Sequence, residues 1–112
     1  MSVTDLYSNT LSALTQARLQ MLSSDWQAAL DKGTSDERLA ASRELLQVQQ
    51  AILALSNESL KDIAGNMGAN STALQAGVTA LNSALQDLSN VQNVIQSVSG
   101  VLSMVGKIVT LL

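Results

Sequence analysis

The sequence contains no cysteine, no histidine, no proline and no phenylalanine. Without cysteine or histidine, the chain lacks disulfides, thiol chemistry and the usual nitrogen and sulfur ligands of a metal site. The same absences exclude Cys–His and Ser–His nucleophiles. No glycine-rich loop follows a strand pattern, so the sequence predicts no phosphate cradle. We therefore expect a protein that is not an enzyme, with no catalytic residues, no metal site and no cofactor.

The charged residues are few and form no basic cluster. The 6 lysines and arginines are scattered, and with 9 aspartates and glutamates they give a net charge of -3. Because a phosphate backbone requires several cations on one surface, we expect no nucleic acid as a partner. The N-terminus lacks the basic and apolar blocks of a cleaved signal peptide. These features fit a cytoplasmic protein or one exported without a cleaved signal peptide.

The hydrophobic residues make up 46% of the chain, but only 2% of the chain is aromatic. Aliphatic side chains suit the seams between helices, and few segments before Val91 show the alternation of a strand. The sequence predicts one all-α domain with a three-helix antiparallel arrangement or a helical hairpin. The predicted helices span about 4–31, 35–64 and 71–112, with turns near 32–34 and 65–70.

The first turn has the clearest local signals. Gly33 can take the left-handed conformation that ends a helix, and Thr34 with Glu37 forms the pattern of a capping box. Just before this turn stands Trp26, the largest side chain in the sequence. We expect Trp26 to pack in the core or at a helix end, with a partner or membrane contact as the alternative.

The second helix carries leucines at intervals of seven and ends in a glycine-rich segment. Its row is Leu39, Leu46, Leu53, Leu60 and Met67, flanked by other aliphatic residues. Gly65 and Gly68 favour a helix stop followed by a short connection. The alternative is a hinge that continues as helix and joins the second and third segments.

The third helix has the most regular apolar pattern, with one apolar residue at every seventh position. A companion row changes flank between Leu85 and Val91, so the apolar stripe rotates there. We expect the main row to be the interface with another chain. Its residues are Leu74, Leu81, Leu88, Ile95, Leu102 and Val109.

The end of this helix is a candidate for membrane contact or for tight helix packing. Small residues recur at steps of three and four, which lets another helix approach closely, although a frayed terminus explains the glycines equally well. Residues 98–112 fall short of the about 20 needed to span a bilayer, and they include Lys107. The candidate residues are Val98, Gly100, Leu102, Val105, Gly106, Ile108 and Leu112.

Three functions fit these patterns. The first is a structural or interaction protein that binds copies of itself, or a helical partner, through the C-terminal row. Small cysteine-free helical subunits of bacterial secretion-associated filaments share this general character, although no motif identifies that family. The second is a membrane-active helical protein with a pore-forming or tail-inserting role. The third is a small cytosolic chaperone or adaptor that offers a groove to a partner helix.

Overall fold

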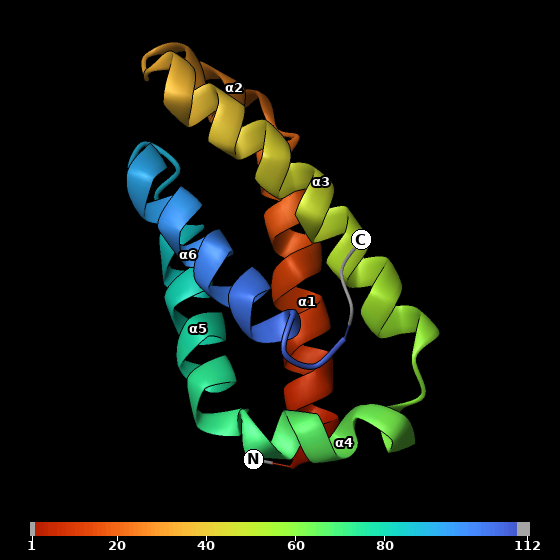
Figure 1. Ribbon diagram of the computed structural model, residues 1–112. Coiled ribbons are helices and arrows are strands. Elements are labelled where there is room, and N and C mark those ends of the chain that lie inside the picture. The colour runs from red at the N-terminus through yellow and green to blue at the C-terminus, as the bar shows by residue number, and fades with distance from the viewer. Residues whose placement is uncertain (1, 110–112) are drawn as a thin grey trace.

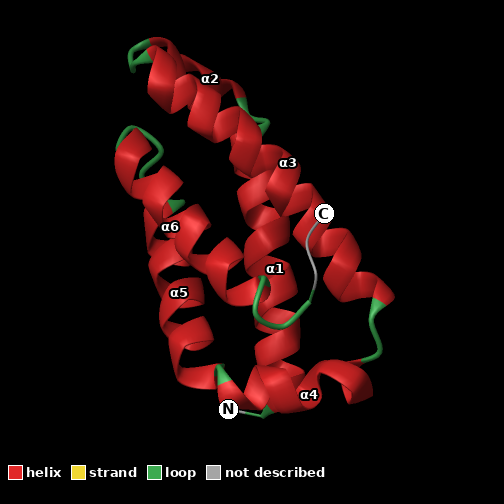
Figure 2. Ribbon diagram, viewed as in Figure 1, coloured by secondary structure: helices red, strands yellow, loops and turns green. Residues whose placement is uncertain are grey.

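A computed structural model describes residues 2–109 and shows them folded into helices joined by short turns (Figures 1 and 2). The prediction of an all-α fold is confirmed, and residues 2–109 contain no strand. Within the described range, six helices form instead of three. They are α1 (Val3–Met21), α2 (Ser24–Asp31), α3 (Ser35–Asn57), α4 (Leu60–Ala69), α5 (Ser71–Ala84) and α6 (Val91–Val105).

The four longer helices surround one core. α1 contacts α3 and α5, and α6 contacts the same two helices from the other side. α5 and α6 form an antiparallel hairpin, while α4 crosses one end of the molecule and α2 lies beside the start of α3 at the other (Figure 1). This arrangement replaces the predicted three-helix packing. It also gives α6 two neighbours within the same chain.

The core contains aliphatic residues from all four longer helices, as well as Trp26. The indole of Trp26 is 1% exposed, so its predicted place in the core is confirmed. α1 is tied to α3 by the Tyr7 hydroxyl, which donates to the carbonyl oxygen of Leu55 at 2.8 Å. α5 and α6 approach closely at Gly77, where an added Cβ would lie 3.5 Å from a methyl group of Val101.

The predicted helix 4–31 is interrupted after Met21. Ser23 caps the new helix α2 because its hydroxyl accepts from the backbone N–H of Trp26 at 3.2 Å. The same hydroxyl donates to the carbonyl oxygen of Gln20 at 2.6 Å. Side-chain bonds of this kind compete with the helical ladder, which explains the break at a serine.

The predicted capping box at Thr34 is confirmed. The Thr34 hydroxyl accepts from the Glu37 backbone, and the Glu37 carboxylate accepts from the Thr34 backbone at 2.8 Å. The left-handed role predicted for Gly33 is wrong, because no glycine among residues 2–109 has a positive φ. Gly33 instead provides space, since a Cβ there would lie 2.6 Å from Oε1 of Glu37.

The turn predicted at 65–70 is confirmed only at Asn70, which separates α4 from α5, so that α5 begins at Ser71 as predicted. The chain also leaves the helical conformation at residues 58–59, and Gly65 and Gly68 lie within α4. Each glycine costs a helix about 1 kcal/mol relative to alanine. The buried side chains of Ile63 and Met67 offset that cost through tertiary packing, while both glycines are exposed.

The predicted long C-terminal helix is divided into α5 and α6. Between them, Asp87 accepts hydrogen bonds from the backbone and hydroxyl of Ser89, and the Asn90 side chain caps α6. These local bonds satisfy the backbone where a continuous helix would otherwise run. The rotation of the apolar stripe between Leu85 and Val91 coincides with this turn.

Candidate functional site

The structure places most of the predicted C-terminal interface inside the chain. Two of its six residues, Leu88 and Ile95, are half-buried near the α5–α6 turn. The other four are buried by contacts within the chain, so a partner cannot reach them while the fold stays closed. They are Leu74, Leu81, Leu102 and Val109.

In the predicted tail segment, large residues are buried and small residues are exposed. Its large residues face the core, whereas Gly100 and Gly106 are exposed, and Leu112 lies outside the described residues. The small residues Ser99 and Ser103 are also exposed, so no helix of the part of the chain that the structure describes packs closely on them. Over residues 2–109, no helix combines the length and the hydropathy required to cross a membrane. The buried tail residues are Val98, Leu102, Val105 and Ile108.

α3 exposes leucines at intervals of seven on its outer side. We name Leu39, Leu46 and Leu53 the outer leucine row; they are 52%, 56% and 62% exposed. The opposite side of α3 faces the core, and most of its aliphatic side chains are smaller than leucine. Single exposed leucines are common on proteins, but a regular row on one helix is an unpartnered apolar face. The core-facing residues of α3 include Ala41, Val48, Ala51 and Leu55.

The surroundings of the outer leucine row carry little charge. Positions three and four residues from Leu46 share its face, and they are Ser42, Arg43, Gln49 and Gln50. Arg43 is the one charged residue in this set. Uncharged polar side chains cost less to bury than carboxylates or ammonium groups, so this face is suited to contact with another helix.

α3 also buries one carboxyl group, that of Glu44. The residue is 7% exposed, and its Oε1 has no hydrogen-bond partner among the described residues. Burial raises the pKa of Glu44 from 4.5 to about 7, because desolvation disfavours the ionised form. The neighbouring α6 carries no charged residue, and no group of three or more potential metal ligands occurs within residues 2–109. Glu44 can therefore hold a proton near neutral pH.

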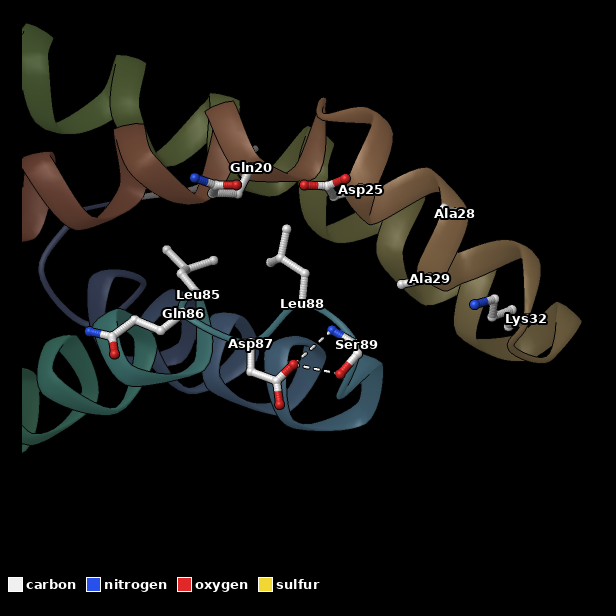
Figure 3. Close-up of a pocket in the computed structure, with 10 residues that line it drawn as sticks. All are labelled: Gln20, Asp25, Ala28, Ala29, Lys32, Leu85, Gln86, Asp87, Leu88 and Ser89. Atoms are coloured by element: carbon white, nitrogen blue, oxygen red, sulfur yellow. Dashed lines mark hydrogen bonds between the residues drawn. The ribbon is translucent and has the colours of Figure 1, made fainter.

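A cleft of about 470 Å³ separates α2 from the turn between α5 and α6 (Figure 3). Leu85 and Leu88 project into it from the turn, and Asp25 and Gln20 lie on the opposite wall. The carboxylate of Asp87 is engaged by hydrogen bonds within its own turn. The lining of the cleft is therefore mixed, with an apolar part from Ala28, Ala29, Leu85 and Leu88 and polar or charged side chains around it.

The cleft continues as a groove along the start of α3. A second hollow of about 330 Å³ shares Ala29 and Lys32 with the cleft, and a third of about 400 Å³ shares Glu37 with the second. Ile95 lines the third hollow, so the two half-buried residues of the predicted interface both lie in this groove. The groove thus brings Leu88 and Ile95 together on one accessible surface.

Comparisons of the chain with models of protein families, with curated proteins and with solved structures find no match. We therefore infer the function from the exposed surfaces of the molecule.

Proposed function

We propose that this protein is a non-enzymatic helical structural protein that associates with copies of itself through the outer leucine row. The observation that supports the proposal is the regular exposure of Leu39, Leu46 and Leu53 on the longest helix, α3. The proposal keeps the self-association that the sequence favours but moves it from the C-terminal row to α3. Association through the C-terminal row would require the core to open at Leu74 and Leu81, which are 0% exposed.

The energy available from the outer leucine row is modest. Fully burying a leucine stabilises by about 1.5–3 kcal/mol, and these leucines retain about half of their exposure. Three leucines from each of two copies therefore supply roughly 6 kcal/mol. This gain is comparable with the lower estimates of the association cost, about 4 kcal/mol. We expect a weak complex whose population depends strongly on protein concentration.

Analytical ultracentrifugation over a wide concentration range tests this proposal. Leu46→Gln removes one leucine from each copy, about 2 kcal/mol in total, and should weaken association roughly 30-fold. Leu22→Gln is the matched control, because Leu22 is 60% exposed but lies outside α3. Equal association of wild-type protein and both variants would place the contact elsewhere, and a wild-type monomer at every concentration would refute the proposal.

The groove beside α2 supports a second function, that of an adaptor for a helical segment. Its lining includes Asp25, Asp36, Glu37 and Asp87 but only one cation, Lys32, and Leu85, Leu88, Val91 and Ile95 supply its largest apolar side chains. An amphipathic helix with leucines on one face and lysines on the other matches this composition. This is the chaperone or adaptor function that the sequence leaves open.

A fluorescent leucine–lysine helical peptide is the probe for the groove. Fluorescence anisotropy should detect binding to the wild-type protein and at least tenfold weaker binding to Leu88→Gln, because Leu88 lines the cleft. Leu22→Gln again provides the control, with unchanged affinity expected. If all three proteins bind the peptide equally, or none binds it, the adaptor function is wrong.

A further inference from the structure

The charge along α3 is unevenly distributed. Every charged residue of the helix lies in its first half, and residues 45–57 carry none. Asp36 and Arg43 lie three or four residues from members of the outer leucine row, so they share its face. The corresponding positions in the second half are the uncharged Gln49 and Ser56. The outer face of α3 therefore has a charged end and an amide-rich end.

This distribution distinguishes the two ways in which two α3 helices can pair. A parallel pair in register would set Arg43 beside the second Arg43 and Asp36 beside the second Asp36, and like charges oppose association. In an antiparallel pair about an axis at Leu46, each charged end faces the amide-rich end of the other copy. The Arg43 guanidinium would then meet Gln49, whose side-chain carbonyl oxygen can accept its hydrogen bond.

The leucine spacing satisfies the same symmetry. Leu39 and Leu53 lie seven residues on either side of Leu46, so a two-fold axis at Leu46 places Leu39 of one copy against Leu53 of the other. The 23 residues of α3 span ~34 Å, at about 1.5 Å per residue, and provide one continuous line of contact.

We propose that the outer leucine row is covered by a second copy of this chain, with the two α3 helices antiparallel about a two-fold axis at Leu46. The inference rests on the self-association proposed above and adds its geometry. Because the same surface is used by both copies, the contact closes on itself and produces a dimer. It does not propagate into a filament through this surface.

Engineered cysteines can read the orientation directly, since the chain has no cysteine of its own. Ser42→Cys and Gln50→Cys flank Leu46 by four residues on either side, and in the antiparallel dimer residue 42 lies opposite residue 50 of the other copy. Two residues 42 would be offset by ~12 Å along the helices, at about 1.5 Å per residue, beyond the reach of a disulfide. Gln27→Cys, exposed on α2, is the control for random collision.

The two variants, one enlarged by a tag, are oxidised separately and as an equal mixture, then separated by mass under non-reducing conditions. We expect the tagged–untagged product only when the two variants are mixed. Its yield should fall roughly 30-fold when both copies also carry Leu46→Gln, as the association does. A disulfide between two copies of the Ser42→Cys variant, when that variant is oxidised by itself, would overturn the antiparallel orientation. Absence of any specific product while the wild-type protein sediments as an oligomer would overturn this geometry and leave self-association standing. A wild-type monomer at all concentrations would overturn both proposals.

Discussion

Glu44 makes the stability of this protein depend on pH in a direction opposite to that of most carboxylates. Its pKa is about 7 in the folded chain and 4.5 when unperturbed, and Oε1 has no hydrogen-bond partner among the described residues. Between these values the folded state keeps the proton that the unfolded state releases, so stability falls as pH rises. The loss is complete by about pH 8, where both states are ionised.

The size of the effect follows from the two pKa values. At about 1.4 kcal/mol per pH unit, Glu44 should lower the free energy of unfolding by about 2.5 kcal/mol between pH 5 and pH 8. Glu44→Gln remains neutral and should abolish this part of the pH dependence. The exposed Glu58→Gln is the matched control and should retain it.

Urea titrations at pH 5 and pH 8 measure the effect, with the buried Trp26 as the fluorescent probe. For each protein, the free energy of unfolding at pH 8 is subtracted from that at pH 5. Comparing this difference between wild-type protein and the variants removes the contributions of the other titrating groups. The same change in wild-type protein and in Glu44→Gln would show that Glu44 does not cause the pH dependence. It would mean that Glu44 is hydrated or paired in solution.

Three further predictions concern the packing. Leu81→Ala should lower the free energy of unfolding by about 2–5 kcal/mol because Leu81 is fully buried. Leu46→Ala should change the free energy of unfolding of the isolated chain by less than about 1 kcal/mol because Leu46 is exposed. Comparable losses for the two variants in urea titrations would contradict the assignment of Leu81 to the core and Leu46 to the surface. Tyr7→Phe should cost about 1 kcal/mol through the lost bond to Leu55, and an unchanged melting curve would argue against that bond. Thr34→Ala should cost about 0.5–2 kcal/mol by removing the capping box, to be measured by thermal unfolding with a threonine-to-serine control that keeps the hydroxyl.

The sequence predicts the features of this fold that depend on local chemistry. The capping box at Thr34 and Glu37 forms because its hydrogen bonds lie within one turn. The burial of Trp26 follows from the cost of leaving an indole in water. The all-α class follows from the period of the apolar residues, which holds over most of the chain.

Features that depend on tertiary packing are harder to predict. Gly65 and Gly68 predict a turn in the sequence, but both are helical because the buried Met67 stabilises α4. The break between α5 and α6 has a local signal in Asp87 and Asn90, but the regular spacing of leucines masks it.

Periodicity also leaves open which side of a helix meets the core. The rows through Leu46 and Leu81 have the same spacing, yet Leu46 is exposed and Leu81 is buried. Glu44 has a signal of its own, since it lies three residues after Ala41 and four before Val48, on the buried side of α3. Only the packing of α3 against α1 and α6 shows that this position is enclosed.

The most direct test of self-association through α3 is a dilution series followed by NMR of the leucine methyl groups. We expect the methyl signals of Leu39, Leu46 and Leu53 to shift with protein concentration, because a second copy covers them. The signals of Leu74 and Leu81, buried within the chain, should stay constant. Concentration-dependent shifts at Leu74 and Leu81 with none in the outer leucine row would contradict self-association through α3, and so would spectra that do not change at any concentration.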